Sequence, residues 1–280
     1  MRILVISQFF PPEMGAPAAR FSDFGRLWVA AGHQVVVVTA FPNWPSGVVP
    51  PAYRGKLYQR ETLDGMDVHR GYIYASARKN IITKSFGYIS FVLSSSLILL
   101  LCRLRYDVVI GTSPPPLVGI PALLASALRR VPMVFDLRDL WPDSPAQIGM
   151  VKSRLLIRFL ERFVMFIYRR ASLITVVTKG KKGILTRDGV RSEKISVVTN
   201  GVDLGLRDTQ ARQPPPGDLD ARLRTSQCFT YAGVLNTGQG LEIVFEAAAK
   251  LKDQAPEFYG RAAYFQPPGY LRLFQCSQFH

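Results

Sequence analysis

Apolar and polar positions follow two different patterns along most of the chain. Short runs rich in valine and isoleucine predict buried strands at residues 2–7, 34–39, 108–111, 133–136, 173–177 and 195–198, with a further strand at 68–74. Longer segments with apolar side chains at helical spacing predict helices at residues 18–31, 83–103, 117–129, 153–170 and 179–187. Strands that alternate with helices in this way predict a doubly wound α/β domain with a parallel sheet.

The alternation stops at residues 210–218, where three prolines and a glycine are incompatible with a helix or a central strand. A strand at 229–232 and a helix at 241–252 follow, but residues 257–280 show no apolar run of clear period. We therefore predict a complete Rossmann-like domain and an incomplete second one. The predicted division is 1–205 for the first domain, 206–225 for a linker, 226–254 for the start of the second domain, and 255–280 for an atypical tail that a frameshift or truncation would explain.

Composition narrows the class of protein. Of the 280 residues, 48% are apolar and 20% are charged, which indicates a globular core. The formal net charge of +15 indicates an anionic partner, such as nucleic acid, anionic lipid or a phosphorylated small molecule. Nucleic acid is disfavoured because the sequence has no helix-turn-helix, zinc-finger or RNA-binding signature. The three cysteines have no metal-ligand spacing and the first strand follows no signal peptide, which favours a reducing cytoplasm.

Two segments bear on membrane binding. Residues 86–102 are apolar or small throughout, and they fit a buried core helix, a helix that dips into a membrane, or a true span, although the run is short for a span. In residues 152–170, Arg154, Arg158 and Arg162 lie on one helical face and apolar side chains cover much of the rest. Such a helix can lie on anionic lipid or can pack on its own sheet.

Polar residues follow several predicted strands, at the carboxyl edge where α/β sheets bind ligands. After the first strand, Pro11, Pro12 and Gly15 lead into a helix whose first turn either holds a phosphate or forms a plain connection. This loop is not a G-x-G-x-x-G fingerprint, and the chain has no P-loop, which disfavours a nicotinamide oxidoreductase or a nucleotide triphosphatase.

Two further blocks occupy the same edge. Asp136, Arg138 and Asp139 follow the strand at 133–136, and they are suited either to sugar hydroxyls and a phosphate or to a buried ion pair. Asn200 and Gly201 follow the strand at 195–198, where Asn-Gly is a strong turn signal and indicates a hinge or a ligand contact.

Together these motifs resemble glycosyltransferase family 4, whose members have the GT-B fold. The order and spacing agree from residue 1 to about residue 253. The matching motifs are Phe10-Pro11-Pro12-Glu13 with Gly15-Ala16, Gly32-His33-x-Val35-x-Val37-x-Thr39, Asp136-x-Arg138-Asp139-Leu140-Trp141-Pro142, Val176-x-Thr178, Asn200-Gly201-Val202-Asp203, and Tyr231-Ala232-Gly233 with Gln239-Gly240-Leu241. A further motif, Pro42-Asn43-x-Pro45-x-Gly47, is similar to the branch that builds bacterial surface polysaccharides, O-antigen included.

The resemblance implies a retaining glycosyltransferase that moves a sugar from a nucleotide-sugar donor, usually UDP-linked, to a lipid-linked or polysaccharide acceptor. It implies no cofactor and no metal requirement, and with the basic charge it implies a peripheral protein on the cytoplasmic face of an anionic membrane. The implied catalytic residues are Asp136, Arg138 and Asp139, and the implied donor-binding residues are Gly15, Asn200, Gly233, Gln239 and Gly240.

The second domain departs from the family pattern. Residues 234–239 contain neither the arginine nor the lysine that many relatives place against the diphosphate, and residues 255–280 contain no recognisable pair of spaced glutamates. The alternative hypothesis is therefore a catalytically inactive remnant that at most binds a membrane or an acceptor.

Overall fold

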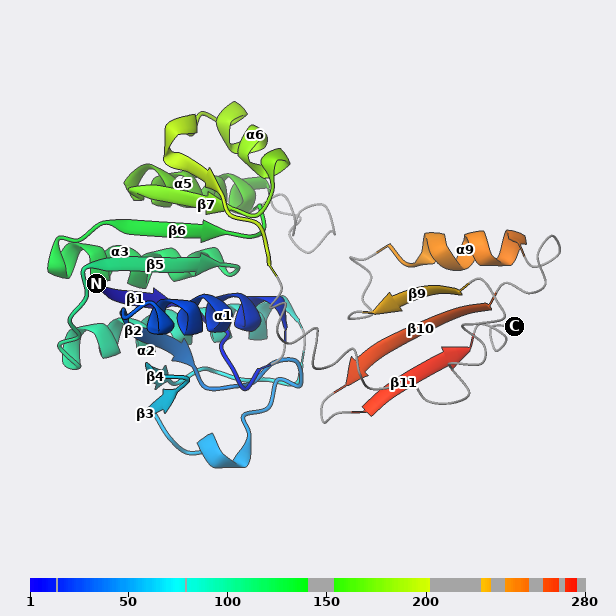
Figure 1. Ribbon diagram of the computed structural model, residues 1–280, viewed down its shortest axis with the longest axis horizontal. Coiled ribbons are helices and arrows are strands. Elements are labelled where there is room, and N and C mark those ends of the chain that lie inside the picture. The colour runs from blue at the N-terminus through cyan, green and yellow to red at the C-terminus, as the bar shows by residue number, and fades with distance from the viewer. Residues whose placement is uncertain are drawn as a thin grey trace. The chain divides into compact units, whose positions relative to one another are not determined.

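The computed structural model describes residues 1–13, 15–78, 80–140, 154–201, 228–232, 240–251, 259–266 and 270–275. The chain divides into two compact units, Met1–Val202 and Asp203–His280. The first unit contains an eight-stranded sheet with the order β3-β4-β2-β1-β5-β6-β7-β8 (Figure 1). Its strands are β1 (Arg2–Ile6), β2 (Gln34–Ala40), β3 (Tyr58–Leu63), β4 (Met66–Gly71), β5 (Val108–Ser113), β6 (Met133–Leu137), β7 (Leu173–Val176) and β8 (Ile195–Val197).

Neighbouring strands of this sheet are parallel except β3 and β4, which pair antiparallel at one edge. All the strands predicted from apolar runs are present. Strand β3 was not predicted, because its side chains alternate only between exposed and half-buried positions and form no apolar run. An edge strand with one solvated face needs fewer apolar residues than a strand covered on both faces.

Five helices of the first unit also confirm the predicted alternation. They are α1 (Ala16–Ala30), α2 (Ile81–Leu101), α3 (Gly119–Arg129), α5 (Arg154–Arg170) and α6 (Lys179–Arg187). Helix α1 lies on one face of the sheet, and α2, α3 and α5 lie on the other (Figure 1). Short 3₁₀ turns occur at Pro51–Tyr53, Pro116–Val118 and Ser192–Lys194.

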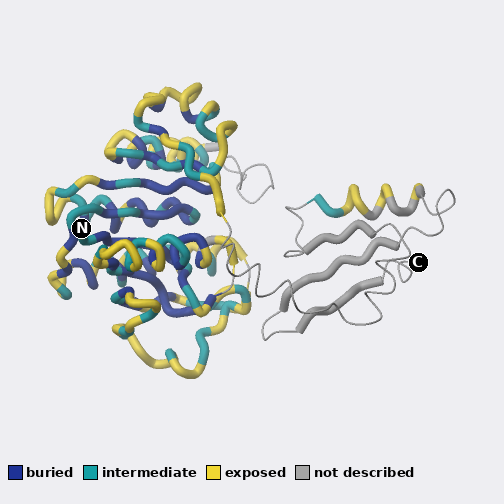
Figure 2. The backbone as a smooth tube through the Cα atoms, viewed as in Figure 1, coloured by how far each residue is buried: buried dark blue, intermediate teal, exposed yellow. Residues whose placement is uncertain are grey.

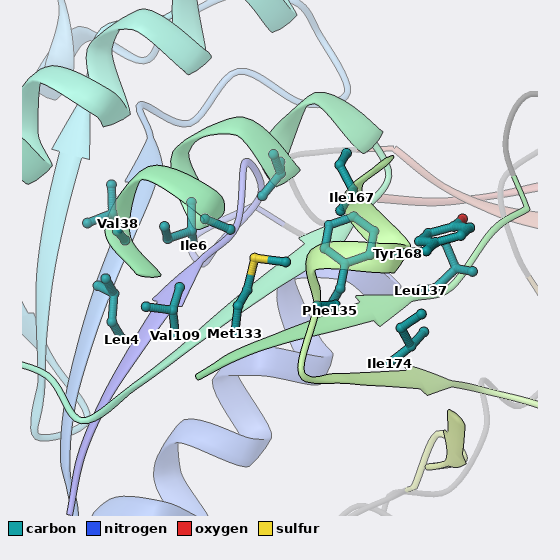
Figure 3. Close-up of a cluster of buried hydrophobic side chains, with 14 of the residues drawn as sticks. Leu4, Ile6, Val38, Val109, Met133, Phe135, Leu137, Ile167, Tyr168 and Ile174 are labelled. Carbon is teal, nitrogen blue, oxygen red and sulfur yellow. The ribbon is translucent and has the colours of Figure 1, made fainter. Parts of the chain in front are cut away.

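The core consists of two apolar clusters, one on each side of the sheet. Successive side chains of a strand point to opposite faces; accordingly, Leu4 and Ile6 of β1 enter the cluster beneath α2, α3 and α5, while Ile3 and Val5 enter the cluster beneath α1. Figure 3 shows part of the larger cluster, where Phe135 of β6 lies beside Ile167 and Tyr168 of α5. The central strands are consequently buried along most of their length (Figure 2).

Helix α2 contains most of residues 86–102, the apolar segment that fits a buried core helix, a helix that dips into a membrane, or a true span. Phe91, Ser95, Ile98 and Leu99 are buried against the sheet, so one face of α2 packs like a helix of a soluble domain. In the described part of the chain, α2 is the one helix long and apolar enough to cross a membrane by length and composition, and 33% of its most apolar window is buried. Burial therefore accounts for one face of this apolar helix and leaves the other unexplained.

The second unit contains β9 (Cys228–Ala232), α9 (Glu242–Leu251), β10 (Tyr259–Gln266) and β11 (Tyr270–Gln275). Strand β10 pairs parallel with β9 and antiparallel with β11, in the order β11-β10-β9. The expectation that no regular strand follows α9 was wrong. Tyrosine and phenylalanine favour strands even without an unbroken apolar run, and both strands contain them. The predicted linker at 206–225 lies outside the described residues.

Candidate active site

The loop that follows β1 is held in place by a buried carboxylate. Glu13 is 6% exposed, and its oxygens accept hydrogen bonds from the backbone N–H groups of Asn43 and Trp44, both at 2.8 Å, and of Phe10 at 3.3 Å. Burial raises the pKa of the Glu13 carboxyl, while the three N–H donors oppose that shift. One side chain thus connects the loop after β1 to the loop after β2.

Arg70 of β4 supports the same loop from the sheet. Its guanidinium is fully buried, pairs with Glu61 at 2.6 Å (Nε to Oε1), and donates to the carbonyl oxygens of Ala40 and Pro11. It also lies over the ring of Tyr53, 5.4 Å from the ring centre, in a cation–π contact. With Glu13, Arg70 fixes the path of the chain that leads to α1.

Gly15 begins α1 in a conformation that other residues rarely adopt. Its φ and ψ are 147° and 158°, and its carbonyl oxygen accepts the N–H of Ala19 at 3.0 Å. No side chain caps the first turn of α1 and that turn has no acidic residue. The positive end of the helix dipole therefore has no charge partner within α1, which suits an anionic ligand.

Replacing Gly15 by alanine is expected to lower the free energy of unfolding by about 1–3 kcal/mol, because a Cβ atom disfavours this region of φ and ψ. Gly183→Ala is the matched control, since a Cβ at Gly183 in α6 meets nothing within 4 Å. Urea denaturation of both variants measures the difference. Equal stabilities would show that the conformation of Gly15 carries no constraint.

Asp136, the fourth residue of β6, has a carboxylate with no free oxygen. The residue is 2% exposed. Arg20 of α1 donates to both oxygens, with Nη2 to Oδ1 at 3.0 Å and Nε to Oδ2 at 3.3 Å. The hydroxyls of Thr112 and Thr175 donate to the same carboxylate at 3.2 and 2.7 Å. Asp136 therefore joins α1, β5 and β7 at the carboxyl edge of the sheet.

Arg20 extends this network to the chain that leaves β8. Its Nη1 donates to Oδ1 of Asn200 at 2.9 Å and to the carbonyl of Thr199 at 3.2 Å, and its Nη2 donates to the carbonyl of Val198 at 2.9 Å. Two predicted site residues, Asp136 and Asn200, are thus brought together by an arginine that the sequence analysis missed. The available signal was a single cation placed one turn after the start of the first helix.

Arg138 presents the opposite situation, a buried cation with unused donors. The residue is 8% exposed, and its Nε and Nη2 have no hydrogen-bond partner in the part of the chain that the structure describes. Burial lowers the pKa of the Arg138 guanidinium, while Asp136 and Asp139 oppose that shift. Arginine nevertheless stays protonated in proteins, and unsatisfied buried N–H groups are costly, so an anion is the partner that this side chain lacks.

Two more buried polar atoms lie at the ends of neighbouring strands. Ser113 ends β5, is in register with Leu137 of β6, and accepts the backbone N–H of Arg138 on its carbonyl oxygen at 3.2 Å. Its hydroxyl and the side-chain oxygen of Gln8, which follows β1, have no hydrogen-bond partner among the described residues. Strands β1, β5 and β6 are adjacent, so they bring three unsatisfied polar side chains to one edge.

Asp139 adds an exposed charge beside Arg138, and Lys181 adds a half-buried one. The side chain of Asp139 is 55% exposed, and its Oδ1 lies 3.6 Å from Nζ of Lys181. Lys181 also donates to the carbonyl oxygen of Arg138. It belongs to the first turn of α6, where Thr178 caps the helix by accepting the Lys181 N–H at 3.2 Å. The sequence analysis missed Lys181 as a site residue, although the Thr178 motif marked the start of its helix.

The structure thus places five predicted residues at the carboxyl edge of the eight-stranded sheet: Gly15, Asp136, Arg138, Asp139 and Asn200. Gly240 precedes α9 in the second unit, with a positive φ of 62°. Gly233 and Gln239 lie outside the described residues. Within the described ranges no three acidic, histidine or cysteine side chains are grouped to hold a metal ion, and metal independence stays a prediction.

A family described as the glycosyl transferase 4-like domain matches residues 15–201, more than half of the chain. The chain belongs to this family. It is 23% identical over 265 residues to a protein named as the colanic acid biosynthesis glycosyl transferase WcaI of Escherichia coli strain K12. That match covers 91% of this chain and 64% of the relative, so the chain spans less than two thirds of the relative's length.

Solved structures with the GT-B fold confirm the predicted fold class. A sucrose-phosphate synthase from Thermosynechococcus elongatus matches with a TM-score of 0.61 at 16% identity, over 96% of this chain and 63% of that one. HepE from Anabaena, solved in complex with UDP and glucose, matches with a TM-score of 0.58 at 17% identity, over 95% and 62% of the respective chains. At these identities the likeness establishes the fold alone.

Proposed function

We propose that this family member transfers a sugar from a UDP-linked donor to a lipid-linked or polysaccharide acceptor in the assembly of a cell-surface polysaccharide, such as an O-antigen. Family membership supports glycosyl transfer. The relative named for colanic acid biosynthesis supports a polysaccharide product, and the UDP and glucose held by HepE support the donor class. Retention at the anomeric carbon and independence of metals and cofactors are part of the proposal.

The observation that carries the proposal is the buried guanidinium of Arg138, whose Nε and Nη2 have no hydrogen-bond partner among the described residues. When a glycosyl bond to a nucleoside diphosphate breaks, negative charge develops on the departing phosphate oxygen. A preorganised cation in a site shielded from water stabilises that charge far more than it would in bulk solvent. Arg138 binds a substrate phosphate in this proposal, with the first turn of α1 and Lys181 as further positive groups at the same edge.

Asp136 and Asp139 have different roles in this proposal. Asp136 positions Arg20 and the chain after β8, because both of its oxygens are already occupied. Asp139 is the exposed carboxylate and is free to accept hydrogen bonds from sugar hydroxyls while it keeps Lys181 beside Arg138. Gly15, Asn200, Gly233, Gln239 and Gly240 remain the proposed donor contacts.

A transfer assay tests this function directly. The purified full chain is incubated with a panel of UDP-sugars and a bacterial membrane extract that contains lipid-linked acceptors, and release of UDP and labelling of lipid are both measured. Transfer of one sugar to lipid supports the proposal. Tight binding of UDP by calorimetry without any turnover, over the whole panel, would overturn it and favour an inactive binding module.

The phosphate that Arg138 binds has two possible sources, the donor diphosphate and the diphosphate of a lipid-linked acceptor. UDP titration of wild-type and Arg138→Gln proteins separates them. A loss of UDP affinity in the variant assigns the donor. Unchanged UDP affinity together with a raised KM for the lipid acceptor assigns the acceptor. If neither changes, Arg138 binds no substrate phosphate.

We further propose a cytoplasmic protein bound peripherally to the inner face of the membrane. The net charge of +15 supports attraction to anionic lipid. A lipid-linked acceptor would also require the enzyme to work at that surface.

A further inference from the structure

The outer face of α2 carries a continuous row of large apolar side chains that no described residue covers. Each is at least 50% exposed, and they recur at intervals of three or four residues, which places them on one side of a helix. We name this row the α2 stripe, and its members are Ile82, Phe86, Ile89, Leu93, Leu97 and Leu100. Scattered exposed apolar residues are ordinary on a protein surface, but a row of this length marks an interaction site.

The stripe lies back to back with the buried face of the same helix. Phe91, Ile98 and Leu99 are at most 6% exposed and belong to the core cluster beneath α2. A helix fixed to the sheet by one face cannot cross a bilayer without leaving the domain. It can, however, lie in the plane of a membrane surface with its free face in the acyl region.

Neighbouring helices add to the same layer. Helices α3 and α5 lie on the same face of the sheet as α2 (Figure 1). Their exposed apolar residues are Ile120 and Leu128 in α3, and Leu155, Phe159 and Phe166 in α5. Helix α5, the predicted basic helix at 153–170, packs on its own sheet through the buried residues Val164 and Ile167. Its exposed apolar side chains lie on the same side of the sheet as α2.

Charge identifies the kind of partner. From residue 68 to residue 135 the sequence contains one acidic residue, Asp107, and that carboxylate pairs with Arg2 at 2.5 Å. Cations flank the stripe at both ends, with Arg78 before its start and Arg103, Arg105, Arg129 and Arg130 near its end. Arg129 donates to the carbonyl oxygen of Arg103 at 3.2 Å, which brings the ends of α2 and α3 together.

We infer that the α2 stripe is a membrane-docking surface that lies flat in an anionic lipid bilayer, with its flanking cations among the headgroups. An apolar row with positive charge at both ends and no carboxylate matches a lipid interface better than a protein partner, whose surface normally presents both signs of charge. The inference extends the proposed function, which places the protein at a membrane, but it rests on the exposure and charge of α2 and not on catalysis.

Vesicle co-sedimentation of the full chain tests the inference. Wild-type protein is mixed with vesicles of phosphatidylethanolamine and phosphatidylglycerol, or with vesicles of phosphatidylcholine alone. We expect binding to the anionic vesicles that weakens as salt is raised, because screening reduces the attraction. The double variant Leu93→Gln/Leu97→Gln is expected to lower the partition coefficient about 10- to 100-fold, since two large apolar groups no longer enter the lipid.

Leu27→Gln is the matched control. Leu27 is 66% exposed, like Leu93, but lies in α1 on the opposite face of the sheet. It is expected to bind vesicles like wild type. Circular dichroism and urea denaturation establish that both variants are folded, and because vesicle binding is measured without turnover, failure of docking and failure of the proposed transfer are distinguishable.

Two results would overturn the docking surface. One is wild-type vesicle binding by Leu93→Gln/Leu97→Gln. The other is sedimentation equilibrium that shows a wild-type dimer in the absence of lipid, which the double variant abolishes; this would assign the α2 stripe to a second copy of the chain.

Discussion

Asp136→Asn is expected to lower the free energy of unfolding of the first unit by about 3–5 kcal/mol, the range for breaking a buried ion pair by removing one charge. The substitution keeps the size of the side chain but leaves the Arg20 guanidinium, whose side chain is 4% exposed, without its counter-charge. Urea denaturation of the full chain, followed by fluorescence, measures the change. A decrease in the free energy of unfolding of less than about 1 kcal/mol would show that the Arg20–Asp136 pair contributes little to stability, contrary to what its buried geometry indicates.

Two comparisons make that result specific. Asp107→Asn breaks a pair with Arg2 whose side chains are 39% and 41% exposed, and it is expected to change stability by no more than about 1 kcal/mol. The double variant Arg20→Met/Asp136→Asn is expected to lose less than the sum of its single variants, because each single variant leaves one buried charge unpaired and the double variant leaves none.

Arg138→Gln is expected to lower kcat for sugar transfer by about 10²- to 10³-fold, the range for removal of one preorganised group that stabilises developing charge. Its effect on stability should be opposite to that of Asp136→Asn. Removing a buried cation with unused donors relieves a desolvation penalty, so the free energy of unfolding should stay the same or rise. Steady-state kinetics and urea denaturation of the same protein sample measure both effects.

The combination of the two measurements is what identifies a functional group. Lost activity with retained stability is the expected signature of Arg138. A variant that is as active as wild type would remove Arg138 from the proposed reaction. A variant that loses several kcal/mol of stability would show instead that the guanidinium is part of the internal support of the fold.

The strands and helices of the first unit could be predicted because each covered strand is a short apolar run and each helix has one apolar face. Strand β3 could not, because an edge strand is stabilised by a neighbour and not by its own apolar residues. Strands β10 and β11 were missed for a related reason, since pairing of β10 with β9 and of β11 with β10 orders residues whose own pattern is irregular.

Site residues were predictable where they follow strands, because strand ends in a parallel sheet share one edge. The contacts among these residues at that edge could not be predicted. Arg20 and Asp136 are separated by 116 positions, and no local pattern shows that they meet. Nor does the sequence reveal that Asp136 is enclosed while Asp139, only three residues later, is exposed. Burial of a polar residue depends on which helix covers it, which is a property of tertiary packing.

The position of α2 sets a distance that the proposed lipid-linked acceptor would have to span. The carboxyl end of β4 lies beside the middle of α2, where the Ser94 hydroxyl donates to the carbonyl oxygen of Tyr72 at 2.7 Å. Strands β2, β1 and β5 lie between β4 and β6, the strand that leads to Arg138. At about 4.8 Å per strand spacing, the carboxyl ends of β4 and β6 are about 19 Å apart. Under the inferred docking, a lipid headgroup beside the middle of α2 would lie about that far from Arg138, and the proposed lipid-linked acceptor would have to bridge the gap before its terminal sugar met the donor. The width of the sheet would then set a minimum length for the saccharide on a lipid-linked acceptor, and shorter saccharides would not reach the donor.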